Sequence, residues 1–148
     1  MFEFDDAPKG LARLIYASRS TEAGGAGLSE QVRIITAKSI HNNRLADITG
    51  FLATGEGRFL QLLEGPVSEV EATFERIRSD PRHTDLAVIA QGAADRRMFR
   101  DWNMAHHQIG PADRTLLAAA GLSDFRPETL DEAGALRILT SLGGRHLR

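Results

Sequence analysis

The feature that most constrains this chain is a pair of apolar segments joined by a short connection rich in glycine. Residues 48–54 and 58–64 both have the composition of β-strands, and Gly55-Glu56-Gly57 between them supplies glycines for positive backbone φ angles. The pattern predicts an antiparallel hairpin. Because Gly65-Pro66 follows directly, the second strand must end there, and the proline suits the first turn of a helix.

The segments around the hairpin predict an alternation of strands and helices. Residues 11–18 predict a first strand, and a helix capped by Ser29 should follow and fade near Asn42 and Asn43. A second helix should begin at Pro66 and end by Asp80-Pro81, because apolar residues recur there at helical spacing. Residues 86–90 and 97–104 predict two more strands. On the last of these, the residues expected to share one face are Met98, Arg100, Trp102 and Met104.

This order predicts an α+β protein, a ferredoxin-like βαββαββ sandwich with both helices of the module on one face of the sheet. The opposite face would carry Ile15, Ala17, Leu60 and Leu62, and something must bury them. Beyond Pro111, two further helices should begin near Asp113 and Pro127, and Gly143-Gly144 should stop the last one. Its expected apolar stripe is Leu130, Ala133, Leu136, Leu139 and Leu142.

The chain therefore divides into three expected parts. Residues 1–9 form an N-terminal extension, residues 10–105 form the αβ module, and residues 106–148 form a helical cap on the other face of the sheet. An apolar stripe that the cap only partly buries would favour a homo-oligomer. The cap could equally be static or respond to events in the module.

Charge and composition exclude several classes of function. The 148 residues carry a net charge of −2 with no basic field, so direct nucleic-acid binding is not expected. The chain has no cysteine, which excludes disulfides and thiolate catalysis. The acidic N-terminus does not resemble a signal peptide, and no apolar run is long enough to span a membrane. We expect a cytoplasmic protein that does not bind membranes.

Two polar residues stand out within the expected strands. Gln61 lies among apolar neighbours on the face predicted to be buried, and a buried amide without partners costs about 1–3 kcal/mol. Its partner could be a structural loop or a ligand. Tyr16 offers the same choice, since a strand tyrosine can send its hydroxyl to solvent. The five histidines have no spacing typical of metal ligands, so a metal site is not expected.

Five segments, read in order, narrow these alternatives because together they resemble the BLUF family. They are residues 14–18, 42–50, 57–65, 80–83 and 99–104, and the resemblance covers about residues 10–105. It implies a blue-light photoreceptor that is not an enzyme. It also implies a non-covalently bound flavin, usually FAD, on the sheet face that carries Tyr16 and Gln61.

The resemblance also assigns roles to individual residues. Tyr16 would donate an electron and a proton to the photoexcited flavin, and Gln61 would bridge the tyrosine and the flavin, with its amide rearranged in the red-shifted signalling state. Asn43, Arg82 and His83 would bind the cofactor. The residues expected to relay the signal are Ser18, Trp102 and Met104.

Two other functions remain open at this point. The chain could be a light-independent flavin enzyme, although it has no nucleophile constellation or nicotinamide fingerprint. It could also be a ferredoxin-like interaction module without a ligand. In the sensor interpretation, about 40 residues after the module leave no room for an appended output domain, so the signal would pass to an unidentified downstream protein.

Overall fold

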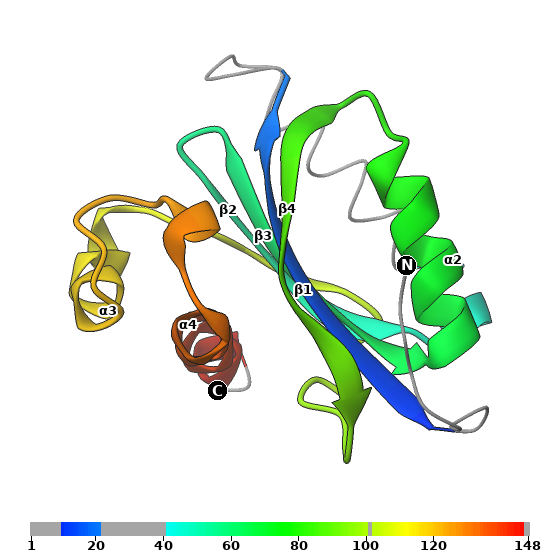
Figure 1. Ribbon diagram of the computed structural model, residues 1–148. Helices are drawn as coiled ribbons and strands as arrows, with labels where there is room; N and C mark the ends of the chain where they lie inside the picture. Colours follow the sequence, from blue (N-terminus) through cyan, green and yellow to red (C-terminus); the bar gives the residue numbers. More distant parts are fainter. Residues whose placement is uncertain (1–9, 22–40, 101, 147–148) are drawn as a thin grey trace.

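The computed structural model describes residues 10–21, 41–100 and 102–146, which form a five-stranded sheet with helices on both faces (Figure 1). The strands are β1 (Leu11–Ser20), β2 (Thr49–Gly55), β3 (Arg58–Pro66), β4 (His83–Ala94) and β5 (Ala105–Gln108). The helices are α2 (Val67–Arg78), α3 (Arg114–Ala119) and α4 (Glu132–His146). Short 3₁₀ turns at Pro111–Asp113 and Pro127–Thr129 precede α3 and α4.

The sheet has the strand order β4-β1-β3-β2-β5. Its central strands β1 and β3 are antiparallel, and their register places Tyr16 directly opposite Gln61. Residues paired in this way point to the same face of a sheet, so the register brings the two polar side chains together. At the edge, β5 runs parallel to β2. The predicted α+β, ferredoxin-like fold is confirmed.

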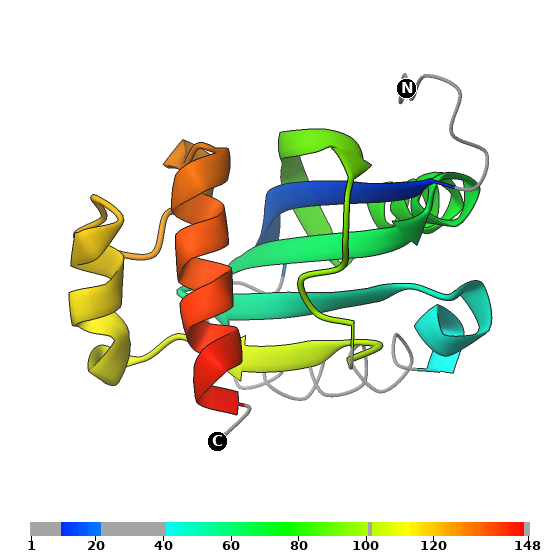
Figure 2. The ribbon, with the colours of Figure 1, turned by 90° about the horizontal axis from the view of Figure 1, so that it is seen from below.

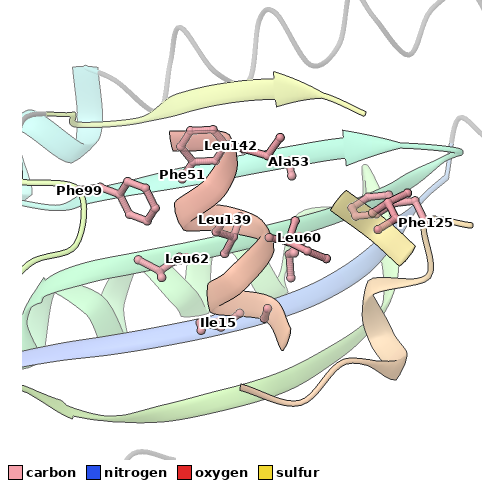
Figure 3. Packing of buried hydrophobic residues seen from close by; sticks show 12 residues of the cluster. Ile15, Phe51, Ala53, Leu60, Leu62, Phe99, Phe125, Leu139 and Leu142 are labelled. Atoms are coloured by element: carbon pink, nitrogen blue, oxygen red, sulfur yellow. The ribbon is translucent and has the colours of Figure 1, made fainter. Parts of the chain in front are cut away.

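Each face of the sheet has its own apolar core. Helix α2 covers one face, where Val70 and Phe74 pack with Leu14 and Leu63. The alternate strand residues point to the opposite face, which α4 covers, with α3 packed beside α4 (Figures 1 and 2). There Leu60, Leu62 and Ile15 lie beneath Leu139 and Leu142 of α4 (Figure 3). The prediction that C-terminal helices bury the second face is confirmed.

The hairpin and the cap differ in detail from the expectation. Gly55 pairs with Arg58, so the connection has two residues rather than three, and both Glu56 (φ 51°) and Gly57 (φ 74°) have positive φ. In α4, Ala133 is exposed and Ala135 takes its place among the buried residues. The prediction that Gly143-Gly144 stops this helix was wrong, because α4 continues to His146.

The fifth strand was also predicted at the wrong place. Residues 97–104 do not form a strand, and β5 begins only at Ala105. The alternating pattern from Met98 to Met104 does not correspond to alternating faces here, because Trp102 and Met104, two residues apart, pack in the cores on opposite faces of the sheet. Strand β4 is longer than the expected 86–90. Ser29 and the start of the first helix lie outside the described residues; residues 41–46 are helical and a turn follows at Asp47.

Candidate functional site

A cavity of about 230 Å³ lies between the sheet and α2. All five residues predicted to bind a cofactor line it, namely Tyr16, Asn43, Gln61, Arg82 and His83. The remaining lining residues are Asn42, Leu52, Phe59, Leu63, Thr73, Arg76, Ile77 and Asp80. Apolar side chains with a few polar groups among them suit a planar apolar ligand that has a polar edge.

A chain of three hydrogen-bonded side chains begins with two residues of the cavity wall and leads away from the cavity. The Tyr16 hydroxyl donates a hydrogen bond to Oε1 of Gln61. The Gln61 Nε2 in turn donates to Sδ of Met104, at 3.4 Å. All three residues are buried, so the amide of Gln61 has one partner on β1 and another on the segment that leads into β5. A rearrangement of this amide must therefore change both contacts.

Tyr16 is held as a neutral phenol. Burial raises the pKa of Tyr16 well above its ordinary value, and the negative charge of Asp80 raises it further. Its ring lies 6.0 Å from that of Phe74 and 6.2 Å from that of His83, measured between ring centroids. The phenol thus keeps its proton, and its hydroxyl hydrogen is directed at Oε1 of Gln61.

His83 joins three elements around the cavity. Its Nε2 lies 2.5 Å from the carbonyl oxygen of Ile77 at the end of α2, and its Nδ1 lies 2.8 Å from Oγ of Ser18 on β1. Because a carbonyl oxygen can only accept, Nε2 carries the hydrogen, and Nδ1 of the neutral ring then accepts from the Ser18 hydroxyl. Ser18 therefore contacts the cavity wall through His83 and does not line the cavity itself.

Asn43 is fixed by the segment that follows β4. Its Nδ2 donates to the backbone carbonyl of Asn103, at 2.9 Å, and the side chain of Asn103 donates to the carbonyl of Ile48. The amide of Asn43 thus sits on the cavity wall with its orientation set by the neighbour of Met104. A ligand bound to Asn43 would contact that segment through a single side chain.

Positive charge lies at one end of the cavity. Arg82 forms hydrogen bonds of 2.5–3.1 Å with the carboxylate of Asp80. The hydrogen bonds from Arg82 hold the pKa of Asp80 below its ordinary value, and the same contact raises the pKa of Arg82. The sequence interpretation missed Arg76. Its signal was helical spacing, since Thr73, Arg76, Ile77 and Asp80 share one face of α2 and its C-terminal end.

Trp102 and Met104 do not lie on the same side of the sheet, so the expectation that they share a strand face was wrong. Met104 packs with Tyr16 and Leu52 beneath α2. Trp102 packs against Phe51, with ring centroids 5.9 Å apart, on the face covered by α4. An irregular backbone lets residues two positions apart reach opposite faces.

Glu64 is a further residue that the sequence interpretation did not single out. Its carboxylate is fully buried and accepts backbone N–H bonds from Met98 (2.8 Å) and Phe99 (2.6 Å). Arg13 lies 3.7 Å away and supplies a positive charge. Glu64 therefore fastens the segment that carries Trp102 and Met104 to β3, three residues from Gln61. A charged residue within a predicted buried strand was the available signal.

The site can thus hold a planar ligand, place a phenol and an amide against it, and connect that amide to a segment reaching the other face.

Comparison with known proteins identifies the family to which the chain belongs. The family model described as BLUF, sensors of blue light using FAD, matches residues 11–105. Photoactivated adenylate cyclase subunit beta of Euglena longa is 35% identical over 115 residues, 72% of this chain but 13% of that protein. The corresponding subunit of Euglena gracilis is 34% identical over the same length.

Solved structures of shorter proteins match over nearly their whole length. The photo-activated state of BlsA superposes with a TM-score of 0.81 at 30% identity, covering 89% of this chain and 94% of BlsA. The dark-state structure of BlrB, a BLUF protein, superposes with a TM-score of 0.69 at 30% identity, covering 90% and 97%. By the family match and these relatives together, the chain belongs to the BLUF family of flavin-based blue-light sensors.

Proposed function

We propose that this protein is a blue-light photoreceptor that binds FAD non-covalently in the cavity between α2 and the sheet. The observation that carries the proposal is the hydrogen-bonded chain that begins with Tyr16 and Gln61 on the wall of that cavity and continues to Met104 behind it. Bound flavin would supply blue absorption and an excited state that accepts an electron. All later steps of the proposed signal would be carried out by residues of this chain.

The fit of a flavin is supported by the chemistry of the cavity wall. Leu52, Leu63 and Ile77 offer apolar surface for a ring system, and the amides of Asn43 and Gln61 offer donors and acceptors to its polar edge. The cavity is smaller than the roughly 300–1,000 Å³ of a typical small-molecule pocket, so it suits the ring rather than a whole dinucleotide. The phosphates would lie toward the cationic end at Arg76 and Arg82.

In the proposed photocycle, Tyr16 gives up an electron and its hydroxyl proton, and Gln61 relays the proton. Both return to Tyr16, so the chain is chemically unchanged except that the amide of Gln61 has rotated or changed tautomer. A rotated amide would present Oε1 rather than Nε2 to Met104, and the N–H···S bond would be lost. The signal would leave the site through the segment that carries Met104 and Trp102.

The output is proposed to pass to a separate downstream protein, with no enzymatic activity in this chain. Support comes from BlsA and BlrB, whose structures superpose on this chain at 30% identity with TM-scores of 0.81 and 0.69. We further propose residues 10–105 as the photosensor, residues 106–148 as its cap, a cytoplasmic location and a homo-oligomer. No helix in the described part of the chain is long and apolar enough to cross a membrane.

Absorption spectroscopy tests this function directly. Protein purified with FAD in the dark should be yellow, and blue light should shift its absorption slightly to the red, reversibly in the dark. Bound flavin without a reversible shift would favour a light-independent flavin enzyme. A protein that retains no flavin would favour a ligand-free interaction module.

A further inference from the structure

A second recess lies on the opposite face from the flavin cavity. It is an open groove of about 720 Å³ between the segment after β4 and the C-terminal half of α4. Its lining includes the arginines Arg96, Arg97 and Arg100, the aromatic residues Phe99 and Trp102, and Gly143 of α4. We refer to it as the arginine groove. None of the functions proposed above uses it.

The groove combines an apolar floor with a cationic rim. Phe99 and Trp102 stack in its floor, with ring centroids 6.0 Å apart, and Phe99 lies near Leu142 of α4 (Figure 3). A methyl group added to Gly143 would come within 2.7 Å of the Phe99 ring, so glycine at this position brings the helix backbone close to the aromatic pair. The floor is therefore built by close packing of two segments far apart in the sequence.

The three arginines of the rim differ in how they are engaged. Arg97 is held in place, since its guanidinium lies 3.1 Å from the carboxylate of Asp47 and donates to Oγ1 of Thr49. Arg96 and Arg100 are exposed and have no ion pair with any residue that the structure describes. The lining residues include no acidic side chain; the described acid nearest in sequence is the exposed Asp95, which lies outside the groove.

The groove also touches the segment that contacts Gln61. Trp102 in the floor is two residues from Met104, which contacts Gln61. Glu64 anchors Met98 and Phe99, which lie in the same wall. A change in the position of this segment would therefore alter the shape of the groove. An occupant of the groove would be sensitive to the state of Gln61.

From this combination we infer that the arginine groove docks an acidic segment of the downstream partner, with carboxylates on Arg96 and Arg100 and an apolar side chain against Phe99 and Trp102. Charge complementarity favours an acidic partner, and the aromatic floor favours one that also carries an apolar anchor. The inference deepens the proposed function, because the occupant is the protein that receives the light signal. Docking itself requires only the groove.

Peptide binding tests the inference. The probe is a fluorescent nine-residue peptide of alternating glutamate and leucine, and the matched probe replaces each glutamate with glutamine. The full chain should bind the acidic peptide saturably and the glutamine peptide weakly. Binding should weaken about tenfold in the double variant Arg96→Glu/Arg100→Glu and with added salt, because both changes reduce the same electrostatic attraction. Arg114→Glu, an exposed arginine on α3 away from the groove, should leave binding unchanged.

Several results would overturn the inference. The first is that the acidic peptide shows no saturable binding. The second is that Arg96→Glu/Arg100→Glu and Arg114→Glu weaken its binding equally. The third is that the glutamine peptide binds as tightly as the acidic peptide. The chain's own N-terminus is also acidic, with Glu3, Asp5 and Asp6, so a triple variant neutralising these residues is measured too. If the peptide binds only to that variant, the groove belongs to the N-terminus and not to a partner. If the double variant instead converts an oligomer to a monomer, the occupant is a second copy of this chain.

The same samples separate this inference from the proposed function. Circular dichroism and thermal unfolding show whether each charge variant is folded, and absorption in the dark and after blue light reports the flavin site. Binding that depends on the two arginines without any light-induced shift would leave the groove assigned and refute the photoreceptor. A normal light-induced shift without arginine-dependent binding would support the photoreceptor and refute docking at the arginine groove.

Discussion

Met104 and Trp102 are two residues apart, and the sheet lies between their contacts. The sulfur of Met104 accepts a hydrogen bond from the Gln61 amide beneath α2, whereas Trp102 packs on Phe51 under α4. One short segment therefore touches both cores of the protein. This gives a local rearrangement at Gln61 a physical route to the opposite face, provided that the segment moves as a unit.

Replacing Met104 tests whether that route begins at its sulfur. The Met104→Leu variant keeps the apolar volume but removes the acceptor of the Gln61 N–H bond. Since this bond is lost in the proposed light-induced state and re-forms as that state decays, removing a net contribution of about 1 kcal/mol should slow the decay by up to about fivefold. The matched control is Met98→Leu, in the same segment but exposed, which should decay as the wild type does. The decay is measured by absorbance. Equal decay rates in the wild type, Met104→Leu and Met98→Leu would show that Met104 does not take part in the route.

Tyr16 is the only tyrosine, so its ionisation can be followed without ambiguity. Burial raises its pKa, so tyrosinate absorbance should not develop near pH 10 in the folded protein, whereas the urea-unfolded chain should titrate at about pH 10. Since only the unfolded chain releases this proton just above pH 10, the free energy of unfolding should fall as the pH rises beyond that value. Tyrosinate formation near pH 10 with the fold intact would show that the phenol is not buried as described.

Glu64 should be required to hold the segment in place. In Glu64→Gln the side chain keeps one oxygen to accept from Met98 or Phe99, but its new amide hydrogens face backbone donors, which should cost about 1–3 kcal/mol. We expect a lower free energy of unfolding and faster amide hydrogen exchange at these two residues. Glu132→Gln, at an exposed position of α4, should change stability by less than about 1 kcal/mol. Unchanged exchange at both amides would mean that Glu64 does not fasten this segment.

Two adjacent glycines of α4 offer a matched test of the packing between the cap and this segment. A Cβ at Gly143 would lie 2.7 Å from Cε1 of Phe99, so Gly143→Ala should destabilise the protein by about 1–3 kcal/mol. A Cβ at Gly144 would meet no atom within 4 Å among the described residues, so Gly144→Ala should stabilise the helix by up to about 1 kcal/mol. Chemical unfolding measures both. The account of this interface fails if the two variants shift stability in the same direction.

The sequence predicted the parts of this fold that repeat a simple period. Alternation placed Tyr16 and Gln61 on one face and Leu60 and Leu62 on the other, and both placements hold because β1 pairs with β3 in a continuous register. The order of elements then predicted the ferredoxin-like topology. The resemblance to the BLUF family selected Asn43, Arg82 and His83 of the cavity lining, which spacing and composition did not single out.

What the sequence did not predict depends on contacts between distant segments. Residues 97–104 alternate as a strand would, yet the hydrogen bonds that Met98 and Phe99 donate to Glu64, together with the packing of Trp102, hold them in an irregular path. Gly143 has a low helix propensity, but α4 continues through it because the missing side chain makes room for Phe99. In both cases tertiary packing overrides a local preference that was interpreted correctly.

The central claim is that Tyr16 and Gln61 together convert light into a rearranged hydrogen bond. The most direct measurement is the light-minus-dark absorption spectrum of the FAD-loaded wild type, Tyr16→Phe and Gln61→Leu, with flavin content determined for each. Both variants should retain flavin, because other residues line most of the cavity, and both should lose the reversible red shift. A normal red shift in either flavin-loaded variant would contradict the account.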